Sequence, residues 1–466
     1  MPEKHTEMDI VDGQLDIDFV KAARRYRLGA VQGERLAQFN LGLMYKNGHG
    51  VEQDYTKAVK WIRLAAEQGL DLAQQQLGLM YKLGYGVGQD YINALKWYRL
   101  AAANNLGLAQ SSLGGMYRNG LGVGQNYTEA MKWYRLAAEQ GLRVAQSNLG
   151  WMYQNGHGVE KDYTEAARWF RVAAEQGEST AQTNLGKMYQ EGLGVERDDT
   201  EAVKWYLLAA EQEEKAGQAN LGYMYEKGLG VGQDDIEAAK WYRLAAEQGE
   251  KSGQTNLGWM YKNGYGVEQD YAEAVKWFRL AADQNEKAAL NNLGWMYEEG
   301  YGVEQDYAAA VAWYCLAAEQ GHKTAQMKLG WMYEHGLSVG QDYMAALKWY
   351  RLAAEQGEAS AQNNIGVMYA QGHGVEQDDV KAVEWYRLAA KQSLSIAQNN
   401  LGCKYEKGCG VEQNYVEAMK WYRLAAEQGH SSAQQNLGDL YQNGHGVEQD
   451  LKEAAKWHQM AEKSAK

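Results

Sequence analysis

The chain has 466 residues, a formal net charge of −13, and 45% hydrophobic residues, which is enough apolar material for a core. Its basic residues are interleaved with acidic ones and not gathered on one face, so nucleic acid and anionic membrane surfaces are poor candidate partners. No long apolar run occurs and the N-terminal residues are acidic, so we expect neither a membrane span nor a secretory signal; the predicted location is the cytoplasm, with signal-independent export left open.

The N-terminal region is expected to hold a tail at residues 1–18 and a degenerate half-repeat at residues 19–33, which forms a cap helix. Ala22 and Tyr26 keep the phase of the units that follow, but Arg25 stands where those units have tryptophan. A terminal helix has no outer neighbour, so a charge at this position avoids an exposed apolar face.

One unit of 36 residues then repeats from residue 34 to residue 466 without insertion or deletion. An array of one small unit predicts a solenoid, which offers a long surface for binding and rarely a pocket for chemistry. The unit is marked by a tryptophan at positions 61, 97, 133, 169, 205, 241, 277, 313, 349, 385, 421 and 457.

The first half of each unit predicts a helix. In the unit at residues 252–285, Leu257, Met260 and Tyr261 recur at helical spacing, and Gly264 ends the segment. Gly258 follows the leucine, and every other unit has a glycine at this position. Glycine inside a helix costs about 1 kcal/mol relative to alanine. We expect that only a hydrogen atom lets a neighbouring tryptophan or helix backbone approach there.

The second half of the unit predicts another helix after a short turn. Asp270 is a strong N-cap, and Glu273 three residues later completes a capping box. Trp277 lies on the apolar face of this second helix. We predict that Trp277 and its equivalents are core residues, with indole rings that seal consecutive hairpins against each other.

Residues 145–177 carry the full pattern of the unit, from Ala-Gln-x-Asn-Leu-Gly-x-Met-Tyr to Ala-Ala-x-x-Gly. This pattern resembles the Sel-one-like repeat, a relative of the tetratricopeptide repeat, over about residues 34–466. The resemblance implies an all-α fold, a right-handed α/α superhelical solenoid of about twelve helix-turn-helix repeats whose first helices line the concave side. Members of this family are typically adaptors that hold other proteins together, and many are bacterial.

A row of asparagines recurs on the outward stripe of the first helices. Asparagine is a mediocre helix former, so its recurrence needs a reason. One reading is an amide that hydrogen-bonds the neighbouring hairpin, and the other is a row that grips the backbone of an extended peptide. The candidate partner-binding members are Asn148, Asn220, Asn256 and Asn292.

An aromatic ladder occupies a second position on the same stripe. This position is variable, since other units have Gly115, Lys187 or Asp439 there, which is not expected of a purely structural position. Exposed tryptophan and tyrosine are typical anchors of protein interfaces. The alternative is that the rings only pack over neighbouring repeats. The candidate partner-binding residues are Trp151, Tyr223, Trp259, Trp295 and Trp331.

Motifs for catalysis or metal binding are sparse. The sequence lacks the serine β-lactamase, lipase, zinc-protease and P-loop signatures, so we expect no catalytic residue, no cofactor and no small-molecule substrate. His373, Cys409 and His445 share one loop position in successive units, and ligands spread along an array do not converge on one ion, so no metal site is expected.

The function expected from these patterns is a non-catalytic protein–protein interaction scaffold that binds a protein or an extended peptide. A β-lactamase-like or cell-wall hydrolase is an alternative carried only by family association. That branch has paired cysteines in each repeat, whereas this chain has three cysteines that follow no period. An exported factor that engages host proteins is the other alternative.

Overall fold

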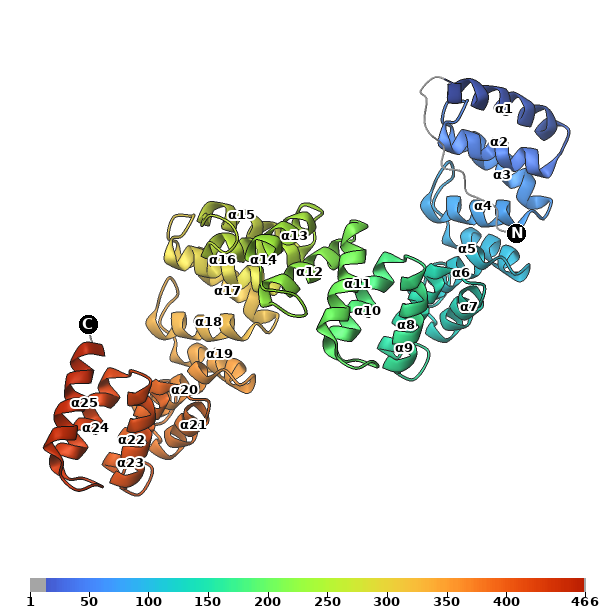
Figure 1. The fold of residues 1–466 in the computed structure, drawn as a ribbon. Coiled ribbons are helices and arrows are strands. Elements are labelled where there is room, and N and C mark those ends of the chain that lie inside the picture. The colour runs from blue at the N-terminus through green and yellow to red at the C-terminus, as the bar shows by residue number, and fades with distance from the viewer. Residues whose placement is uncertain (1–13, 465–466) are drawn as a thin grey trace. The chain divides into compact units, whose positions relative to one another are not determined.

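The computed structural model describes residues 14–464, so residues 1–13 of the expected tail lie outside the described residues. Every regular element in this range is an α-helix, and no strand occurs between residues 14 and 464. None of the helices in the same range is both long and apolar enough to cross a membrane. The chain divides into two compact units, residues 1–234 and 235–466, and each is described by itself (Figure 1).

The helices of the first unit are α1 Gln14–Val31, α2 Arg35–Asn47, α3 Tyr55–Glu67, α4 Asp71–Leu83, α5 Tyr91–Ala103, α6 Gly107–Asn119, α7 Tyr127–Glu139, α8 Arg143–Asn155, α9 Tyr163–Glu175, α10 Ser179–Glu191, α11 Asp199–Glu211 and α12 Lys215–Lys227. α1 therefore begins at Gln14, inside the range expected to be the tail. The boundaries 1–18, 19–33 and 34–466 stay a prediction.

The helices of the second unit are α13 Asp235–Glu247, α14 Lys251–Asn263, α15 Tyr271–Ala282, α16 Lys287–Glu299, α17 Tyr307–Glu319, α18 Lys323–His335, α19 Tyr343–Glu355, α20 Ala359–Gln371, α21 Asp379–Lys391, α22 Ser395–Lys407, α23 Tyr415–Glu427, α24 Ser431–Asn443 and α25 Leu451–Ser464. Even-numbered helices are the first helices of the repeats, and odd-numbered helices from α3 onward are the second helices. Consecutive hairpins stack within each unit, which confirms the predicted all-α solenoid of helix-turn-helix repeats (Figure 1).

The helix ends follow the predicted signals, with one difference. Gly264 closes α14 with a φ of 73°, a left-handed conformation that favours glycine. Asp270 caps α15, since its Oδ1 accepts the backbone N–H of Glu273 at 3.0 Å. The reciprocal half of the capping box is wrong, because the Asp270 N–H donates to the Tyr261 carbonyl at 2.9 Å and the Glu273 carboxylate pairs with Lys276.

In most second helices the buried aromatic residue is the one after the tryptophan, so the predicted core position is wrong by one residue there; in α25 Trp457 itself is buried, as predicted. Phe278 is fully buried in the core of its repeat, whereas Trp277 is half-buried. Neighbouring residues lie about 100° apart around a helix, so only one of the two can point into the hairpin. The fully buried equivalents of Phe278 include Tyr98, Tyr134, Phe170, Tyr206, Tyr242, Tyr314, Tyr350 and Tyr422.

The helical glycine makes room for this buried ring. A Cβ atom added at Gly258 would lie 2.8 Å from Cδ1 of Phe278 and 3.2 Å from the Ala274 carbonyl oxygen. Real Cβ atoms essentially never come that close to a ring carbon. The steric role of the glycine is confirmed, although the ring that approaches is phenylalanine or tyrosine and not tryptophan.

The tryptophans lie at the seam between hairpins. Trp133 of α7 packs against the core formed by α5 and α6, and its other face lies under Lys132, whose Nζ is 5.9 Å from the ring centroid. The indole therefore contacts the preceding repeat, as predicted, but it is half-buried. Within the described part of the chain, several indole N–H groups of this row are buried without a hydrogen-bond partner: those of Trp133, Trp169, Trp205, Trp277 and Trp421.

Two polar links, which the sequence patterns did not predict, join consecutive helices along the stack. Gln284 Nε2 donates to Gln254 Oε1 at 2.9 Å, and Gln254 Nε2 donates to the Ala246 carbonyl at 3.2 Å. Arg243 Nη2 donates to Tyr261 Oη at 2.6 Å. Both links recur at the same positions of other repeats, so each hairpin is fixed to the one before it by hydrogen bonds as well as by apolar contact.

Candidate protein-binding surface

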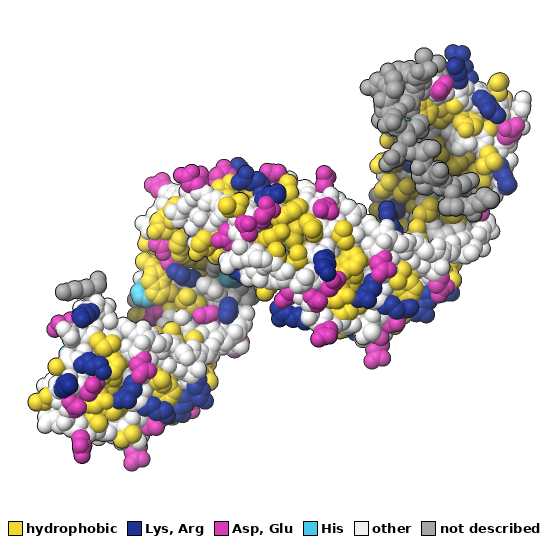
Figure 2. All heavy atoms as spheres, in the orientation of Figure 1, with side chains coloured by type: hydrophobic (Ala, Val, Ile, Leu, Met, Phe, Trp, Pro, Cys, Tyr) yellow, Lys and Arg dark blue, Asp and Glu magenta, His cyan; other side chains and the backbone are white. Residues whose placement is uncertain are grey.

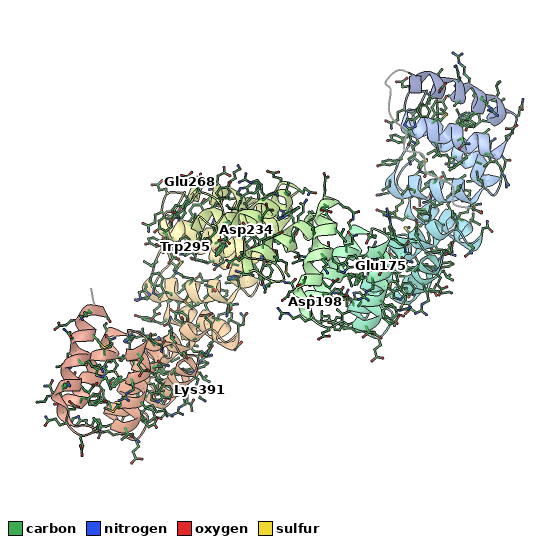
Figure 3. All side chains as sticks on the ribbon, in the orientation of Figure 1. Glu175, Asp198, Asp234, Glu268, Trp295 and Lys391 are labelled. Atoms are coloured by element: carbon green, nitrogen blue, oxygen red, sulfur yellow. The ribbon has the colours of Figure 1, made fainter. Side chains whose placement is uncertain are left out.

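The aromatic ladder lies on the first helices. In the first unit Trp151 belongs to α8 and Tyr223 to α12, and Tyr223 is 38% exposed. In the second unit the members are Trp259 of α14, Trp295 of α16 and Trp331 of α18, all half-buried. Trp295 is labelled in Figure 3. The three tryptophans pack against the core cluster of α15–α18 with part of each ring and leave the rest accessible.

Basic side chains cover faces of these rings. Lys262 of α14 places its Nζ 3.8 Å from the Trp295 centroid, and Arg118 of α6 places its guanidinium 5.3 Å from the Trp151 centroid. Both cations come from the preceding repeat, so they bridge neighbouring first helices through cation–π contacts. Burial lowers the pKa of Lys262. The ladder is therefore a surface of half-covered indoles interleaved with positive charge.

Loop residues stack on the same rings, a feature that sequence reasoning missed. Tyr301 lies against Tyr271 at a centroid distance of 4.7 Å and against Trp295 at 5.2 Å. His157 makes the equivalent contacts with Tyr127 and Trp151. The sequence does contain a pattern that could have predicted this contact. In these cases the first residue of a second helix is a tyrosine, and a histidine or aromatic residue follows in a loop 30 residues later. The stack fixes the loop to the preceding repeat.

This stacking accounts for two of the loop residues weighed as metal ligands. His373 lies 4.4 Å from the ring centroid of Tyr343, and His445 lies 4.6 Å from that of Tyr415. Each histidine belongs to its own repeat, and they do not converge. Over residues 14–464, no group of three or more His, Cys, Asp or Glu side chains is arranged to hold a metal ion. The three cysteines are unpaired.

The asparagine row makes contacts between repeats at several positions. Asn148 Oδ1 accepts from Arg118 Nη1 of the preceding repeat at 2.9 Å. Asn400 Nδ2 donates to Asn363 Oδ1 at 3.0 Å, which joins α22 to α20. These amides hydrogen-bond the neighbouring hairpin, which is the structural one of the two roles considered for the row. The partner-binding role of Asn148, Asn220, Asn256 and Asn292 stays a prediction; all four are half-buried.

A buried charged cluster lies beside the ladder in the second unit. The Glu298 carboxylate accepts from Lys328 Nζ at 2.8 Å and from Tyr314 Oη at 2.5 Å, and its side chain is 7% exposed. Burial, with the hydrogen bond to Glu298, raises the pKa of Tyr314. The three groups satisfy one another and link α16, α17 and α18, so this cluster positions the helices that carry Trp295 and Trp331.

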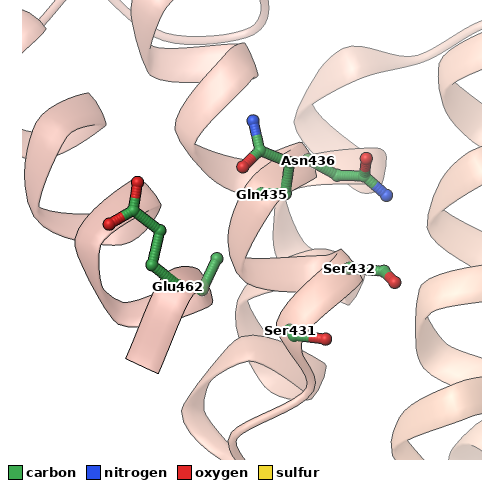
Figure 4. Close-up of a pocket in the computed structure, with 6 residues that line it drawn as sticks. Ser431, Ser432, Gln435, Asn436 and Glu462 are labelled. Carbon is green, nitrogen blue, oxygen red and sulfur yellow. The ribbon is translucent and has the colours of Figure 1, made fainter. Parts of the chain in front are cut away.

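The hollows of the surface are open. One of about 510 Å³ lies between α24 and α25 and is shown in Figure 4. Its lining residues are Ser431, Ser432, Gln435, Asn436, Ala461 and Glu462, a set with no histidine, cysteine or basic side chain. Elsewhere on the face in view, hydrophobic side chains form separate patches among charged ones (Figure 2). The hollow between α24 and α25 is thus an open part of the surface.

Comparison with known proteins agrees with this architecture. The Sel1 repeat matches twelve consecutive segments, at residues 35–70, 71–106, 107–142, 143–178, 179–214, 215–250, 251–286, 287–322, 323–358, 359–394, 395–430 and 431–464. Curated proteins gave no match.

Two solved structures with sequence similarity extend this comparison. A protective antigen of uropathogenic Escherichia coli strains, which displays an SLR fold, is 38% identical, with a TM-score of 0.75 over 95% of this chain and 94% of its own. A Sel1 repeat protein from Oxalobacter formigenes is 32% identical over 71% of this chain and 97% of its own, with a TM-score of 0.49.

Proposed function

Because the chain belongs to the Sel1 repeat family, whose solenoids are generally protein-interaction scaffolds and typically non-catalytic, we propose that it binds a protein or an extended peptide along the face formed by its first helices. The proposed contact residues are the aromatic ladder, Trp151, Tyr223, Trp259, Trp295 and Trp331, with the asparagines Asn148, Asn220, Asn256 and Asn292 beside it.

The observation that carries this proposal is the contrast between two positions of the same first helix. Leu257 is buried against the second helix, and the equivalent position is leucine or isoleucine in every repeat. Trp259, two residues later, is only half-buried, and its equivalents include Gly115, Lys187 and Asp439. A position that packing does not determine, and that nonetheless carries large aromatic residues in α14, α16 and α18, supports a role in binding.

The surroundings of the ladder favour recognition as well. Each tryptophan of the ladder contacts a neighbouring ring, and Trp295 contacts both Lys262 and Tyr301. A ring that is already fixed loses little conformational entropy when a partner covers its remaining surface. Half-buried indoles therefore suit anchors better than free ones.

The experiment compares two triple variants of the full chain. Trp259→Ala/Trp295→Ala/Trp331→Ala removes the ladder of the second unit, and Leu280→Ala/Leu316→Ala/Leu388→Ala removes exposed leucines of second helices in the same unit. The parent protein is used to capture its partner from native lysate, and the affinity of the purified partner for each variant is then measured. The proposal expects at least a tenfold loss for the tryptophan variant and less than a twofold change for the leucine variant. Full retention by a folded tryptophan variant would contradict it.

The hydrolase alternative makes a different prediction, since it requires turnover of a β-lactam substrate such as nitrocefin. The scaffold proposal expects the purified chain to leave the nitrocefin spectrum unchanged. Turnover that copurifies with the parent protein would show that the chain is an enzyme.

A second candidate function uses the same surface outside the cytoplasm. The Escherichia coli relative is described as a protective antigen, which favours an exported factor that engages host proteins. Protease treatment of intact producing cells tests it. Digestion of the chain without release of a cytoplasmic marker supports export, and full protection supports a cytoplasmic scaffold.

A further inference from the structure

A row of exposed apolar residues lies on the first helices of the first unit, at a repeat position different from that of the aromatic ladder. Leu36, Leu72, Leu108 and Val144 hold the same position in α2, α4, α6 and α8, and they are 60%, 45%, 47% and 49% exposed. The equivalent residues of α14, α16, α18 and α20 are Ser252, Ala288, Thr324 and Ser360. α22 has an exposed isoleucine at this position, Ile396, but four consecutive apolar residues occur there only in the N-terminal repeats.

Basic residues run parallel to this row. Leu36, Leu43 and Lys46 follow one another at spacings of seven and three residues, which places them on one side of α2 within about 80° of one another, with Lys46 about 15 Å further along the helix axis than Leu36. Lys82 and Arg118 hold the position of Lys46 in α4 and α6, whereas the same position in α8, α10 and α12 is Gln154, Gln190 and Glu226. Three consecutive repeats thus combine exposed apolar side chains with a cation.

Arg118 has partners on the next first helix. Its guanidinium donates to Asn148 and lies over Trp151. On the first helices that follow Lys46 and Lys82, the residues equivalent to Trp151 are Leu79 and Gly115, and neither has an aromatic ring. No hydrogen bond or ion pair of the Lys46 or Lys82 ammonium occurs with any residue in the described range 14–464. These two half-buried lysines are therefore cations without an acidic partner among the described residues.

We propose that the stripe formed by Leu36, Leu72, Leu108, Lys46 and Lys82 binds an acidic peptide segment of another protein, with apolar side chains of the segment on the leucines and its carboxylates on the lysines. The argument is complementarity of charge and polarity. Unpaired cations attract carboxylates, and the adjacent leucines lose exposed surface only to apolar groups. A single-stranded nucleic acid fits poorly, since bases stack on aromatic rings and this row is aliphatic.

The first helices α2, α4 and α6 pack against the second helices between them, so the exposed leucines of neighbouring repeats are separated along the stack. A polyproline-II chain has three residues per turn, so every third side chain returns to one face. A peptide of four Leu-Glu-Glu triplets therefore presents leucines on one face and carboxylates on the others, the two kinds of group that the stripe is proposed to bind. This surface uses no residue of the aromatic ladder, so either proposal can fail alone.

The test measures fluorescence anisotropy of a labelled twelve-residue (Leu-Glu-Glu)₄ peptide with the full chain. The variant Lys46→Glu/Lys82→Glu is compared with Lys96→Glu/Lys132→Glu, which makes the same charge change on exposed second-helix lysines of the same unit. We expect the first variant to lose at least tenfold in affinity and the second less than threefold. A third variant, Leu36→Ser/Leu72→Ser/Leu108→Ser, alters exposed side chains only and is expected to lose at least tenfold with unchanged circular dichroism.

Control peptides and a control variant test the chemistry and the location of the site. The peptides (Ser-Glu-Glu)₄ and (Leu-Lys-Lys)₄ should bind at least tenfold more weakly, and the Trp259→Ala/Trp295→Ala/Trp331→Ala variant should bind (Leu-Glu-Glu)₄ like the parent. Equal binding by all lysine and leucine variants, or no binding at millimolar peptide, overturns the proposal. Tighter binding to a variant that lacks residues 2–13 would identify that acidic segment as the occupant and overturn the assignment to another protein.

Discussion

Two adjacent aromatic residues of most second helices have different roles, and the difference is set by the glycine opposite them. Phe278 fits against Gly258 inside its hairpin, whereas Trp277 lies at the seam to the preceding hairpin. Sequence periodicity alone could not separate them, because both fall within the broad apolar stripe of an amphipathic helix. The deciding information, the missing side chain of Gly258, belongs to the other helix.

The substitution Gly258→Ala is expected to destabilise the second unit. Its Cβ would meet the Phe278 ring, and overpacking costs about 1–3 kcal/mol, more than the roughly 1 kcal/mol that alanine regains in helix propensity. Gly340→Ala is the matched control, since a Cβ there meets no atom within 4 Å. Thermal unfolding followed by circular dichroism should show a lower midpoint for Gly258→Ala only. Equal midpoints would contradict the steric account.

Truncation of the two aromatic residues should give unequal losses. Phe278→Ala removes a fully buried ring and should destabilise the unit by about 3–5 kcal/mol. Trp277→Ala removes a half-buried ring, so its effect should be smaller despite the larger side chain. Urea denaturation of both variants measures the order, and a larger loss for Trp277→Ala would restore the tryptophan as the principal core residue.

His322 gives the second unit a pH-dependent helix cap. Its Nδ1 accepts the Ala325 N–H at 3.3 Å. This hydrogen bond requires a neutral imidazole with no proton on Nδ1. Burial, and then the nearby Lys287, lowers the pKa of His322 in the folded state. The unfolded chain therefore binds the proton more readily, so the stabilisation is complete above the ordinary histidine pKa of about 6.5 and declines as the pH falls below it.

His322→Asn tests this cap, since asparagine keeps a cap acceptor that does not titrate in this range. Between pH 7.5 and 5.5, the unfolding midpoint of the parent should fall more than that of the variant. Parallel pH profiles for the two proteins would show that His322 does not contribute to the dependence.

At the scale of the hairpin, the sequence predicted most of what the structure shows. The 36-residue period predicted both helices of every repeat. Gly264 predicted where α14 ends, and Asp270 predicted where α15 begins. The contacts between repeats were not predictable in the same way, since Tyr301 and Tyr271 are 30 residues apart and only stacking brings them together. The binding roles of the ladder and of the asparagine row remain predictions.

The buried glutamines show that the pattern of hydrogen bonds differs at one repeat. Gln74 Oε1 is buried without a partner in the described residues. The residue that would donate to it is Asn104, one methylene shorter than the glutamine found there in other repeats, and its amide bonds Asp71 instead. The bond between the two helices of this hairpin is thus lost through a change of side-chain length, while Gln74 Nε2 still donates to the Ala66 carbonyl of the preceding hairpin at 3.2 Å.

A double-mutant cycle measures the strength of the glutamine link where it is intact. Gln254→Ala should destabilise the second unit by about 0.5–1.5 kcal/mol, because it removes one of the two hydrogen bonds to the Ala246 carbonyl, which still accepts from the Gly249 N–H at 2.9 Å. Gln284→Ala should have a smaller effect, since Gln284 is exposed. The two changes are expected to couple by about 0.5–1.5 kcal/mol. Strict additivity of the two effects would show that the Gln284–Gln254 bond does not contribute to stability.

At the scale of the molecule, one scaffold carries surfaces of different chemistry. The first unit has Leu36 and Lys46 on α2. The second unit has Lys262 on α14 and Trp295 on α16. The core positions stay nearly constant from repeat to repeat while the outward positions vary. An array of this kind separates stability from recognition, because changes on the outward stripe leave the glycine, the buried ring and the glutamine link untouched.

The central claim is that partners bind the first-helix face, and site-specific photocrosslinking in producing cells tests it most directly. A photoreactive residue is placed at exposed first-helix positions, Lys187 and Ser252, or at exposed second-helix positions, Lys132 and Lys276. We predict discrete crosslinked complexes from Lys187 and Ser252 and none from the other two. Complexes that form only from Lys132 and Lys276 would contradict the account.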